Sequence, residues 1–293
     1  MAAARRQRPR RPQTVAEVMR GGRGQLTPAE LRVAQTLLAD YPAAGLQSVA
    51  ALAERAGVSG PTVVRLVAKL GFAGYAELQS RLRAELSARN AGPVQRYPSA
   101  DGARQASPLL RRFERSVSAA VSESLVSIDA VEFDAAVSLL VDPHRPVRIT
   151  GGRVSSVHAL YLARSLALLR PDVRFVEAER AVRAATLLDV GPESVVVVFD
   201  YRRYDDEVIE FGRGVATAGA SVVLMTDTYL SPLAASATVL LTSSVEGPAP
   251  FITLTPALAI VEALVLGAVE RTGSPLRRRL ERFDTLNADL SSP

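Results

Sequence analysis

The sequence predicts an α + α/β protein, in which an all-α N-terminal helix-turn-helix domain precedes a doubly wound parallel-sheet α/β sandwich. Helical periodicity runs through residues 26–86. After Pro146, short β-rich runs alternate with helical patterns, which is typical of a parallel sheet. Residues 195–198 are four consecutive valines, as expected for a strand that is buried on both faces. The length of 293 residues suits about two domains.

Composition divides the chain into four segments. Residues 1–24 are rich in Arg, Pro and Gly and are expected to form a flexible basic arm. Residues 25–88 hold the helix-turn-helix domain. Residues 89–108 carry Pro and Gly with little apolar periodicity, which indicates a linker. Residues 109–293 form the α/β domain, with strands expected at 147–150, 173–176, 195–199, 221–225 and 238–242, and helices at 155–169, 178–188, 205–218 and 255–271.

The charge distribution and the composition limit the classes of partner that the chain is expected to bind. Residues 1–90 carry 14 Lys and Arg against 6 Asp and Glu, whereas residues 91–293 carry 21 against 24. This basic first third predicts a polyanionic partner, although a basic arm without a function would look the same. The chain has no Cys and two His, so we expect no metal and no cofactor. Its apolar stretches are shorter than the roughly 18 residues of a membrane span, and we expect a cytoplasmic protein with no membrane partner.

Residues 48–70 have the pattern of a helix-turn-helix. Ser48 can cap a first helix, Gly57 permits a sharp turn, and Ser59 with Pro61 can begin a second helix. The exposed face of the second helix would then carry hydroxyls and cations able to reach phosphates and base edges of double-stranded DNA. The predicted DNA-binding residues are Ser48, Ser59, Gly60, Thr62, Arg65 and Lys69. The alternative is a plain helical hairpin with a solvated basic face.

Residues 26–86 resemble the N-terminal domain of the RpiR (MurR/RpiR-type) transcriptional regulators. The resemblance rests on a signature that includes Val58, Ser59, Thr62, Val63, Arg65, Lys69, Leu70, Gly71, Phe72, Gly74, Tyr75, Glu77 and Leu78. Gly60 stands where that family often has a polar residue, so sequence readout at this position is expected to differ.

This resemblance implies that the second domain is a SIS (sugar isomerase) domain, a five-stranded α/β sandwich that binds phosphosugars. The loop after the first strand resembles the family's G-x-G-x-S loop through Gly151 and Ser155, and a helix start there is a possible anion site. The candidate ligand-binding residues in this loop are Gly151, Gly152, Arg153, Ser155 and Ser156. A tight connection without a ligand is the alternative.

The loop after the middle strand departs from the family. A phosphosugar-binding SIS domain usually has S-x-S-G-x-T there, whereas this chain places Asp200 and Arg202 at the Ser positions, Arg203 at the Gly and Asp205 at the Thr. Ser243 and Glu246 follow the fifth strand, where a third wall of the pocket would lie. We therefore keep Asp200, Tyr201, Arg202, Arg203, Ser243 and Glu246 as candidate ligand-binding residues.

Three interpretations of this pocket remain open. It binds an anion through Arg153, Arg202 and Arg203, or it binds a cationic or hydroxylated ligand through Asp200, Tyr201 and Tyr204. In the third, the charged side chains form salt bridges and no small molecule binds.

These patterns predict a DNA-binding transcriptional regulator whose SIS-like domain senses a small anionic metabolite, sugar-derived or a carboxylate, and modulates operator binding. A helix-turn-helix normally pairs to read two half-sites, so we expect a homodimer or homotetramer. Helices at 117–128 and 257–269 are candidate contact surfaces, although both suit the core equally. The alternatives are an effector-independent DNA-binding dimer and a sugar-phosphate isomerase. No acid–base pair supports an enzyme, so no catalytic residue is predicted.

Overall fold

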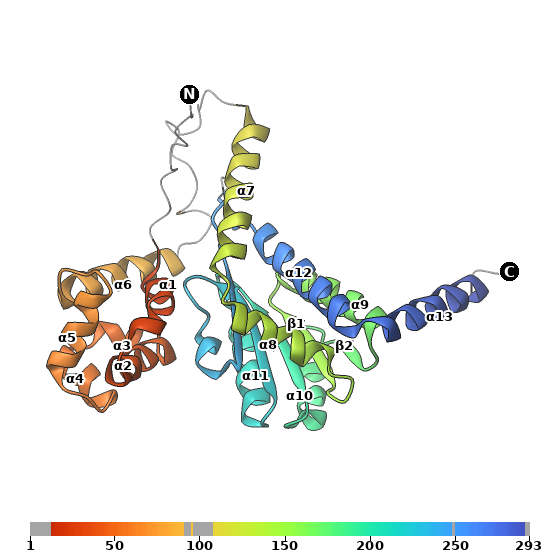
Figure 1. Ribbon diagram of the computed structural model, residues 1–293, viewed down its shortest axis with the longest axis horizontal. Coiled ribbons are helices and arrows are strands. Elements are labelled where there is room, and N and C mark those ends of the chain that lie inside the picture. The colour runs from red at the N-terminus through yellow and green to blue at the C-terminus, as the bar shows by residue number, and fades with distance from the viewer. Residues whose placement is uncertain (1–12, 91–94, 96–107, 248–249, 291–293) are drawn as a thin grey trace. The chain divides into compact units, whose positions relative to one another are not determined.

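The computed structural model describes residues 13–90, 95, 108–247 and 250–290 (Figure 1). It separates into two compact units, Met1–Ser87 and Ala88–Pro293. Each unit has its own core and is described by itself. The expected linker, residues 89–108, lies largely outside the described residues, as do residues 1–12 of the expected arm.

The first unit is all helical. Its elements are α1 (Val15–Gly21), a short 3-10 turn (Arg23–Gln25), α2 (Pro28–Ala39), α3 (Ala43–Leu46), α4 (Val49–Arg55), α5 (Gly60–Lys69) and α6 (Tyr75–Asn90). Thr27 and Glu30 form a capping box at the start of α2, which satisfies backbone N–H groups that the helix leaves unpaired. The core is built by leucines from successive helices, including Leu37, Leu52, Leu66, Leu78 and Leu82.

The segment expected to be a flexible arm is ordered from Thr14 onward, which corrects the predicted boundary at residue 24. Thr14 and Glu17 form a second capping box, and Val15 and Met19 of α1 are buried. The buried carboxylate of Glu85 accepts a hydrogen bond from the Val15 N–H at 2.8 Å. The capping-box spacing at residues 14–17 was the local signal for this helix, but the Arg-rich composition before it obscured the pattern.

The second unit contains a five-stranded parallel sheet in the order β2-β1-β3-β4-β5. The strands are β1 (Val147–Gly151), β2 (Val173–Phe175), β3 (Val195–Asp200), β4 (Ser221–Asp227) and β5 (Val239–Ser243). The expected fold class is confirmed. The chain leaves β1 toward β2 on one side and returns to β3 on the other. The carboxyl ends of β1 and β3 therefore form the switch point at which ligands of such sheets bind.

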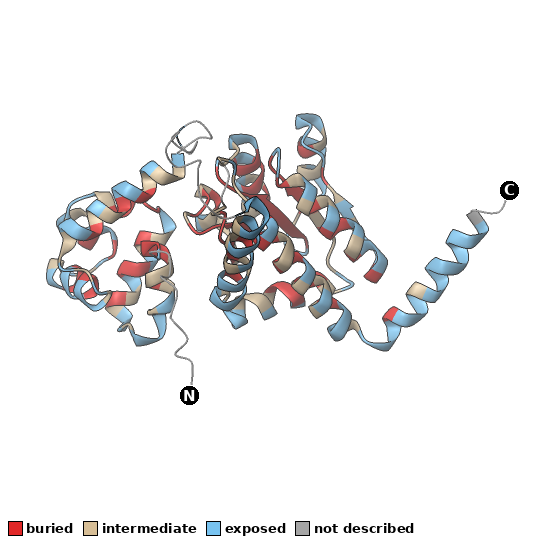
Figure 2. Cartoon of the chain, turned by 90° about the horizontal axis from the view of Figure 1, so that it is seen from above, coloured by how far each residue is buried: buried red, intermediate tan, exposed pale blue. Residues whose placement is uncertain are grey.

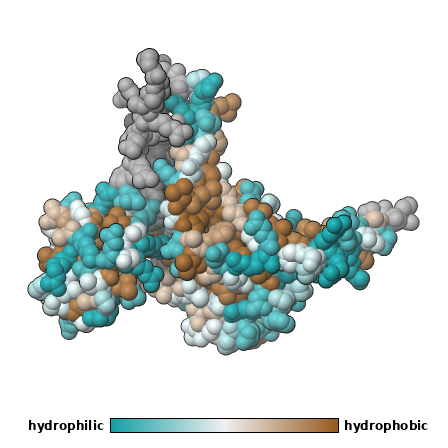
Figure 3. Space-filling view, in the orientation of Figure 1, coloured by the Kyte–Doolittle hydropathy of each residue, from teal (hydrophilic) through white to brown (hydrophobic). Residues whose placement is uncertain are grey.

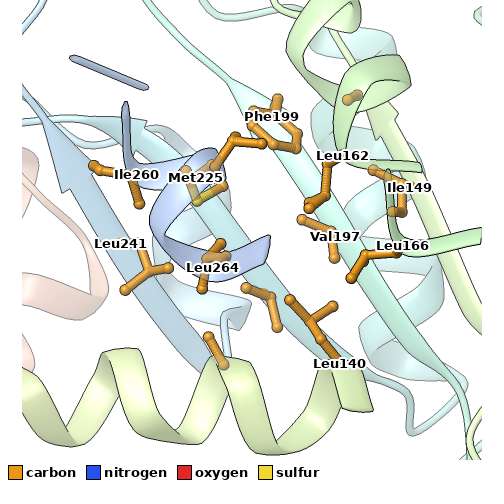
Figure 4. Packing of buried hydrophobic residues seen from close by; sticks show 14 of the residues in the cluster. Leu140, Ile149, Leu162, Leu166, Val197, Phe199, Met225, Leu241, Ile260 and Leu264 are labelled. Atoms are coloured by element: carbon orange, nitrogen blue, oxygen red, sulfur yellow. The ribbon is translucent and has the colours of Figure 1, made fainter. Parts of the chain in front are cut away.

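Helices cover both faces of this sheet (Figure 1). Alternate residues of β3 belong to two different cores, with Val197 and Phe199 in one and Val196 and Val198 in the other, which explains the unbroken valine run. The first core is packed by α8 (Ala130–Val141), α9 (Ser156–Leu169) and α12 (Thr255–Thr272), as Figure 4 shows for Leu140, Leu162 and Leu264. The second is packed chiefly by α11 (Asp206–Thr217) and the 3-10 helix Pro232–Ser236, with α10 (Arg180–Asp189) beside α11.

Two helices at the ends of this unit complete it. α7 (Leu109–Ser127) buries Val117 and Ala120, and α12 buries a longer stripe that includes Ile260 and Leu264. Both candidate contact helices therefore contribute to the core. Figure 3 shows apolar side chains gathered over α7 in this view, and the exposed residues near its end include Leu125 and Val126.

A helix that the sequence pattern did not predict, α13 (Ser274–Leu290), follows α12. Most of it is exposed where it extends from the sheet (Figure 2). Arg279 attaches it to α9 by donating hydrogen bonds to the carbonyls of Ala167, Leu168 and Arg170. In the described residues, no helix is both long enough and apolar enough to cross a membrane.

Candidate functional site

Helices α4 and α5 form a helix-turn-helix. The turn between them passes through Gly57, whose φ of +61° is a left-handed conformation that glycine adopts without strain. The Val58 N–H closes the turn by donating to the Ala53 carbonyl at 2.9 Å. Ser48 caps α4, as its side chain accepts a hydrogen bond from the Ala51 N–H. Leu52 and Leu66 are fully buried, so the two helices pack on a common core.

The hydroxyls at the start of α5 bond to each other and not to the backbone. Ser59 was expected to cap α5 through its side chain, but its Oγ lies 3.0 Å from Thr62 Oγ1 and makes no capping bond. Thr62 is buried, and its hydroxyl also accepts a hydrogen bond from Arg65 Nη2 at 3.1 Å. The side chain of Thr62 therefore positions Ser59 and Arg65, and these two remain exposed.

The exposed face of α5 carries more apolar surface than expected. Val64 is 48% exposed and shares a face with Pro61, Arg65 and Ala68, which follow the helical spacing. Lys69 is exposed, but its ammonium pairs with the Glu30 carboxylate at 2.9 Å. The pKa of Glu30 lies below its ordinary value, chiefly because of the hydrogen bond from the Thr27 backbone N–H and next because of Lys69. Sequence reasoning missed Val64 because it sits beside the core residue Val63 in an apolar pair.

A cavity of about 260 Å³ opens in the second unit where β1 and β3 end. Seven predicted residues line it, namely Gly152, Arg153, Ser155, Asp200, Tyr201, Arg202 and Arg203. Gly151, Ser156, Ser243 and Glu246 are not among its lining residues. The further lining comes from Val154, Asp205, Pro250, Phe251, Ile252 and Leu254. The apolar segment between β5 and α12 was the sequence signal for this last wall, and it was not used.

The loop after β1 uses its hydroxyls to close on itself. Ser155 Oγ donates to the Phe199 carbonyl at 2.7 Å and accepts from the Gly152 N–H at 3.1 Å. Ser156 Oγ donates to the Arg153 carbonyl at 3.3 Å. A Cβ on Gly151 would lie 2.9 Å from the Ser156 backbone N, so this close approach requires glycine. Ser155 thus ties the loop after β1 to the end of β3, and Ser156 closes the loop on itself, which accounts for both hydroxyls without a ligand.

The loop after β3 is held by carboxylates. Asp200 is buried, and its two oxygens accept hydrogen bonds from the Ser231 hydroxyl and from the Asp205 N–H. Burial raises the pKa of Asp200 to about 7. Asp205 caps α11 by accepting from the Glu207 N–H at 3.1 Å.

Arg202 points into a network of the protein's own groups. Its Nη2 lies 2.5 Å from Glu246 Oε1, its backbone N–H donates to Asp227, and its guanidinium lies 4.4 Å from the centroid of the Tyr229 ring. Its Nε is buried and has no hydrogen-bond acceptor in the part of the chain that the structure describes. Asp227 is fully buried, which raises its pKa.

The tyrosines beside this network are also engaged. Tyr201 is buried and accepts a hydrogen bond from Ser243 Oγ, while the Tyr204 hydroxyl donates to Asp227 at 2.9 Å. Ser243 and Glu246 therefore do not line the cavity but bind residues that do, namely Tyr201 and Arg202. Arg153 and Arg203 line the cavity as exposed cations, and within the described residues neither side chain has a hydrogen-bond or ion-pair partner.

Comparisons with known proteins agree with both units. A family model for the rpiR-family helix-turn-helix domain matches residues 14–89, and a SIS-domain model matches residues 140–267. The HTH-type transcriptional regulator HexR of Pseudomonas aeruginosa is 27% identical over 269 residues, covering 88% of this chain and 90% of HexR.

Two solved structures share the fold. The sugar isomerase domain of an RpiR transcription factor from Sphaerobacter thermophilus is 19% identical, with a TM-score of 0.54 over 60% of this chain and 97% of that chain. The NanR protein of Vibrio vulnificus, solved with ManNAc-6P, is 18% identical, with a TM-score of 0.55 over 95% of this chain and 99% of that chain. The expected regulator, and not the isomerase, is supported by the helix-turn-helix model and by HexR. The chain belongs to the RpiR-type transcriptional regulators, with a helix-turn-helix domain followed by a SIS domain.

Proposed function

We propose that this regulator binds operator DNA through α5 and that a small anionic metabolite in the cavity at the β1 and β3 ends changes its DNA affinity. The observation that carries the sensing role is the cavity itself, which lies at the sheet's switch point. It is lined by the exposed arginines Arg153 and Arg203, whose side chains have no partner in the part of the chain that the structure describes. The solved NanR complex with ManNAc-6P supports a sugar-derived ligand for this fold.

The DNA contacts are assigned to the exposed positions of the helix-turn-helix. Arg65 can bind guanine or phosphate, while Ser48, Ser59 and the backbone near Gly60 are placed at the starts of α4 and α5, where N–H groups and hydroxyls reach phosphates. Thr62 acts by positioning Arg65, and Lys69 shares its charge with Glu30.

Regulation requires that the ligand bind two states of the protein with unequal affinity, because equal affinity shifts no equilibrium. A helix-turn-helix reads DNA most effectively as a symmetric pair, so we propose a homodimer or homotetramer as the active species. The exposed apolar residues Leu125 and Val126 near the end of α7 suit such a contact.

The test is fluorescence anisotropy of the full chain with DNA from upstream of its own gene, at several salt concentrations, with and without sugar acids and sugar phosphates. We expect sequence-preferring binding that one compound shifts at least fivefold. Arg65→Ala should weaken binding at least tenfold, whereas Arg174→Ala, an exposed arginine on β2, should not. Binding without preference over random DNA would contradict the proposal.

A second candidate is a DNA-binding dimer that needs no effector. The ion pair between Arg202 and Glu246 favours it, because one of the three arginines at the cavity is already neutralised by the protein. Sequence-specific DNA binding that no compound in the panel shifts would support this candidate.

A further inference from the structure

The chain's own carboxylates occupy the amides at the start of α11. The Asp205 N–H donates to Asp200 Oδ1 at 3.1 Å, and the Glu207 N–H donates to Asp205 Oδ1 at 3.1 Å. In phosphosugar-binding SIS domains this loop supplies hydroxyls and amides to the phosphate. Here the same place is filled by internal anions, so these donors are not available to a ligand phosphate.

Charge at this helix start opposes phosphate as well. Asp206 and Glu207 stand in the first turn of α11, directly after the capping carboxylate of Asp205. A helix start attracts anions through its dipole, and three carboxylates here already use that attraction. A phosphate dianion placed at this loop would meet the carboxylates of Asp200 and Asp205, which both line the cavity.

The cavity carries exposed cations from two of its loops. Arg153 belongs to the loop after β1 and Arg203 to the loop after β3, and both are exposed where they line the cavity. The cavity thus offers two guanidinium groups whose side chains have no ion-pair partner among the described residues, whereas the amides at the α11 start are already bound.

The remaining walls fix the rest of the ligand. Asp200 lines the cavity, and each of its oxygens accepts one hydrogen bond, which leaves further lone pairs for a ligand hydroxyl. Phe251, Ile252 and Leu254 add apolar side chains to the lining of the cavity. An arginine pair recognises a planar carboxylate well, because its donors match the two carboxylate oxygens.

We propose that the cavity selects a non-phosphorylated polyhydroxy carboxylate, a sugar acid, with Arg153 and Arg203 binding the carboxylate and Asp200 accepting a hydroxyl. This inference rests on the proposed sensing role and specifies its ligand class. It separates this chain from a SIS domain whose loop amides hold a phosphate, because here the amides of Asp205 and Glu207 are bound by Asp200 and Asp205.

The experiment is calorimetry of the full chain with four probes: D-gluconate, D-glucuronate, 6-phospho-D-gluconate and D-glucose 6-phosphate. We expect at least one of the two sugar acids to bind, and each phosphorylated probe to bind at least tenfold more weakly than the tighter acid. Arg153→Gln and Arg203→Gln should each weaken acid binding at least tenfold. Arg174→Gln, an exposed arginine on β2, is the matched control and should leave it unchanged.

A second variant tests the self-occupied loop directly. Asp205→Ser keeps a helix-capping side chain but removes the carboxylate, so it should improve binding of 6-phospho-D-gluconate at least fivefold. Thermal melting confirms that each variant is folded.

The inference is overturned if a phosphorylated probe binds as tightly as the sugar acids, if none of the four probes binds at 10 mM, or if Asp205→Ser leaves phosphate binding unchanged. The proposed function fails separately, when the same preparation shows no preferential DNA binding or no compound shifts it. If a sugar phosphate binds as tightly as the sugar acids and shifts DNA affinity, the inferred ligand class is wrong and the proposed sensing function stands.

Discussion

The two units each carry an arginine in a candidate binding motif, and the two arginines differ in burial. Arg65 of the helix-turn-helix stays exposed on α5 and is steered by one hydroxyl, whereas Arg202 of the SIS domain has a side chain only 3% exposed and binds Glu246 and Asp227. The difference follows from how far along the chain the hydrogen-bonding neighbours of each arginine lie. The neighbour of Arg65 lies within one helical turn, whereas those of Arg202 come from the end of β4 and from the segment after β5. A motif therefore specifies function more reliably where its partners are local.

The largest effect should come from breaking the core beneath the DNA-binding face. Leu66→Ala removes a fully buried side chain of α5 and should cost about 2–5 kcal/mol. Hydrogen exchange of the α5 and α6 amides measures this loss, and DNA affinity should fall with it. Val64→Ala, on the exposed face of the same helix, is the control and should change stability by less than about 0.5 kcal/mol. Equal losses in the two variants would show that α5 faces its core differently.

The second prediction concerns the buried carboxyl at the cavity. Burial raises the folded-state pKa of Asp200 from 3.8 to about 7, so its stabilising contribution is complete below pH 4 and is lost as the pH rises through 7. Between pH 5 and 8 this loss amounts to about 2–3 kcal/mol in the free energy of unfolding. Asp200→Asn should flatten the pH dependence in denaturant unfolding at pH 5, 6, 7 and 8. Parallel curves for the two proteins would contradict the assignment.

The third prediction tests the ion pair that distinguishes Arg202 from Arg65. Glu246→Gln leaves the buried guanidinium with a neutral partner and should lower the free energy of unfolding of the SIS domain by about 1–2 kcal/mol, since Glu246 itself is 45% exposed. Glu193→Gln, another exposed glutamate of this unit, should have little effect. If both variants melt at the wild-type temperature, the pair does not hold the loop.

The smallest effect separates two serines that look equivalent in the sequence. Ser48→Ala removes a side-chain cap and should cost about 1 kcal/mol, whereas Ser59→Ala removes only a bond to Thr62 and should cost less than about 0.5 kcal/mol. Thermal unfolding of the two variants in parallel measures the difference. A larger loss for Ser59→Ala would mean that its hydroxyl caps α5 in solution.

The predictable parts of the fold are those with local signals. The five strands follow from β-rich runs, and the turn at Gly57 follows from its spacing between two apolar helices. The site was less accessible, because its contacts join distant segments. Ser155 meets the Phe199 carbonyl, and Arg202 meets Glu246, at separations of 44 residues in both cases. No periodicity reports such pairs, so residue type alone left three interpretations of the pocket open.

Helix α9 links the cavity to the end of the chain. Its first turn follows the Arg153–Ser155 lining, and its last carbonyls are held by Arg279 of α13. At 14 residues it is about 21 Å long, and a helix of this length moves as one stiff rod. The same helix therefore joins a wall of the cavity at its first turn to the hydrogen bonds of Arg279 at its last turn, so a ligand that tilts α9 would also strain its contact with α13.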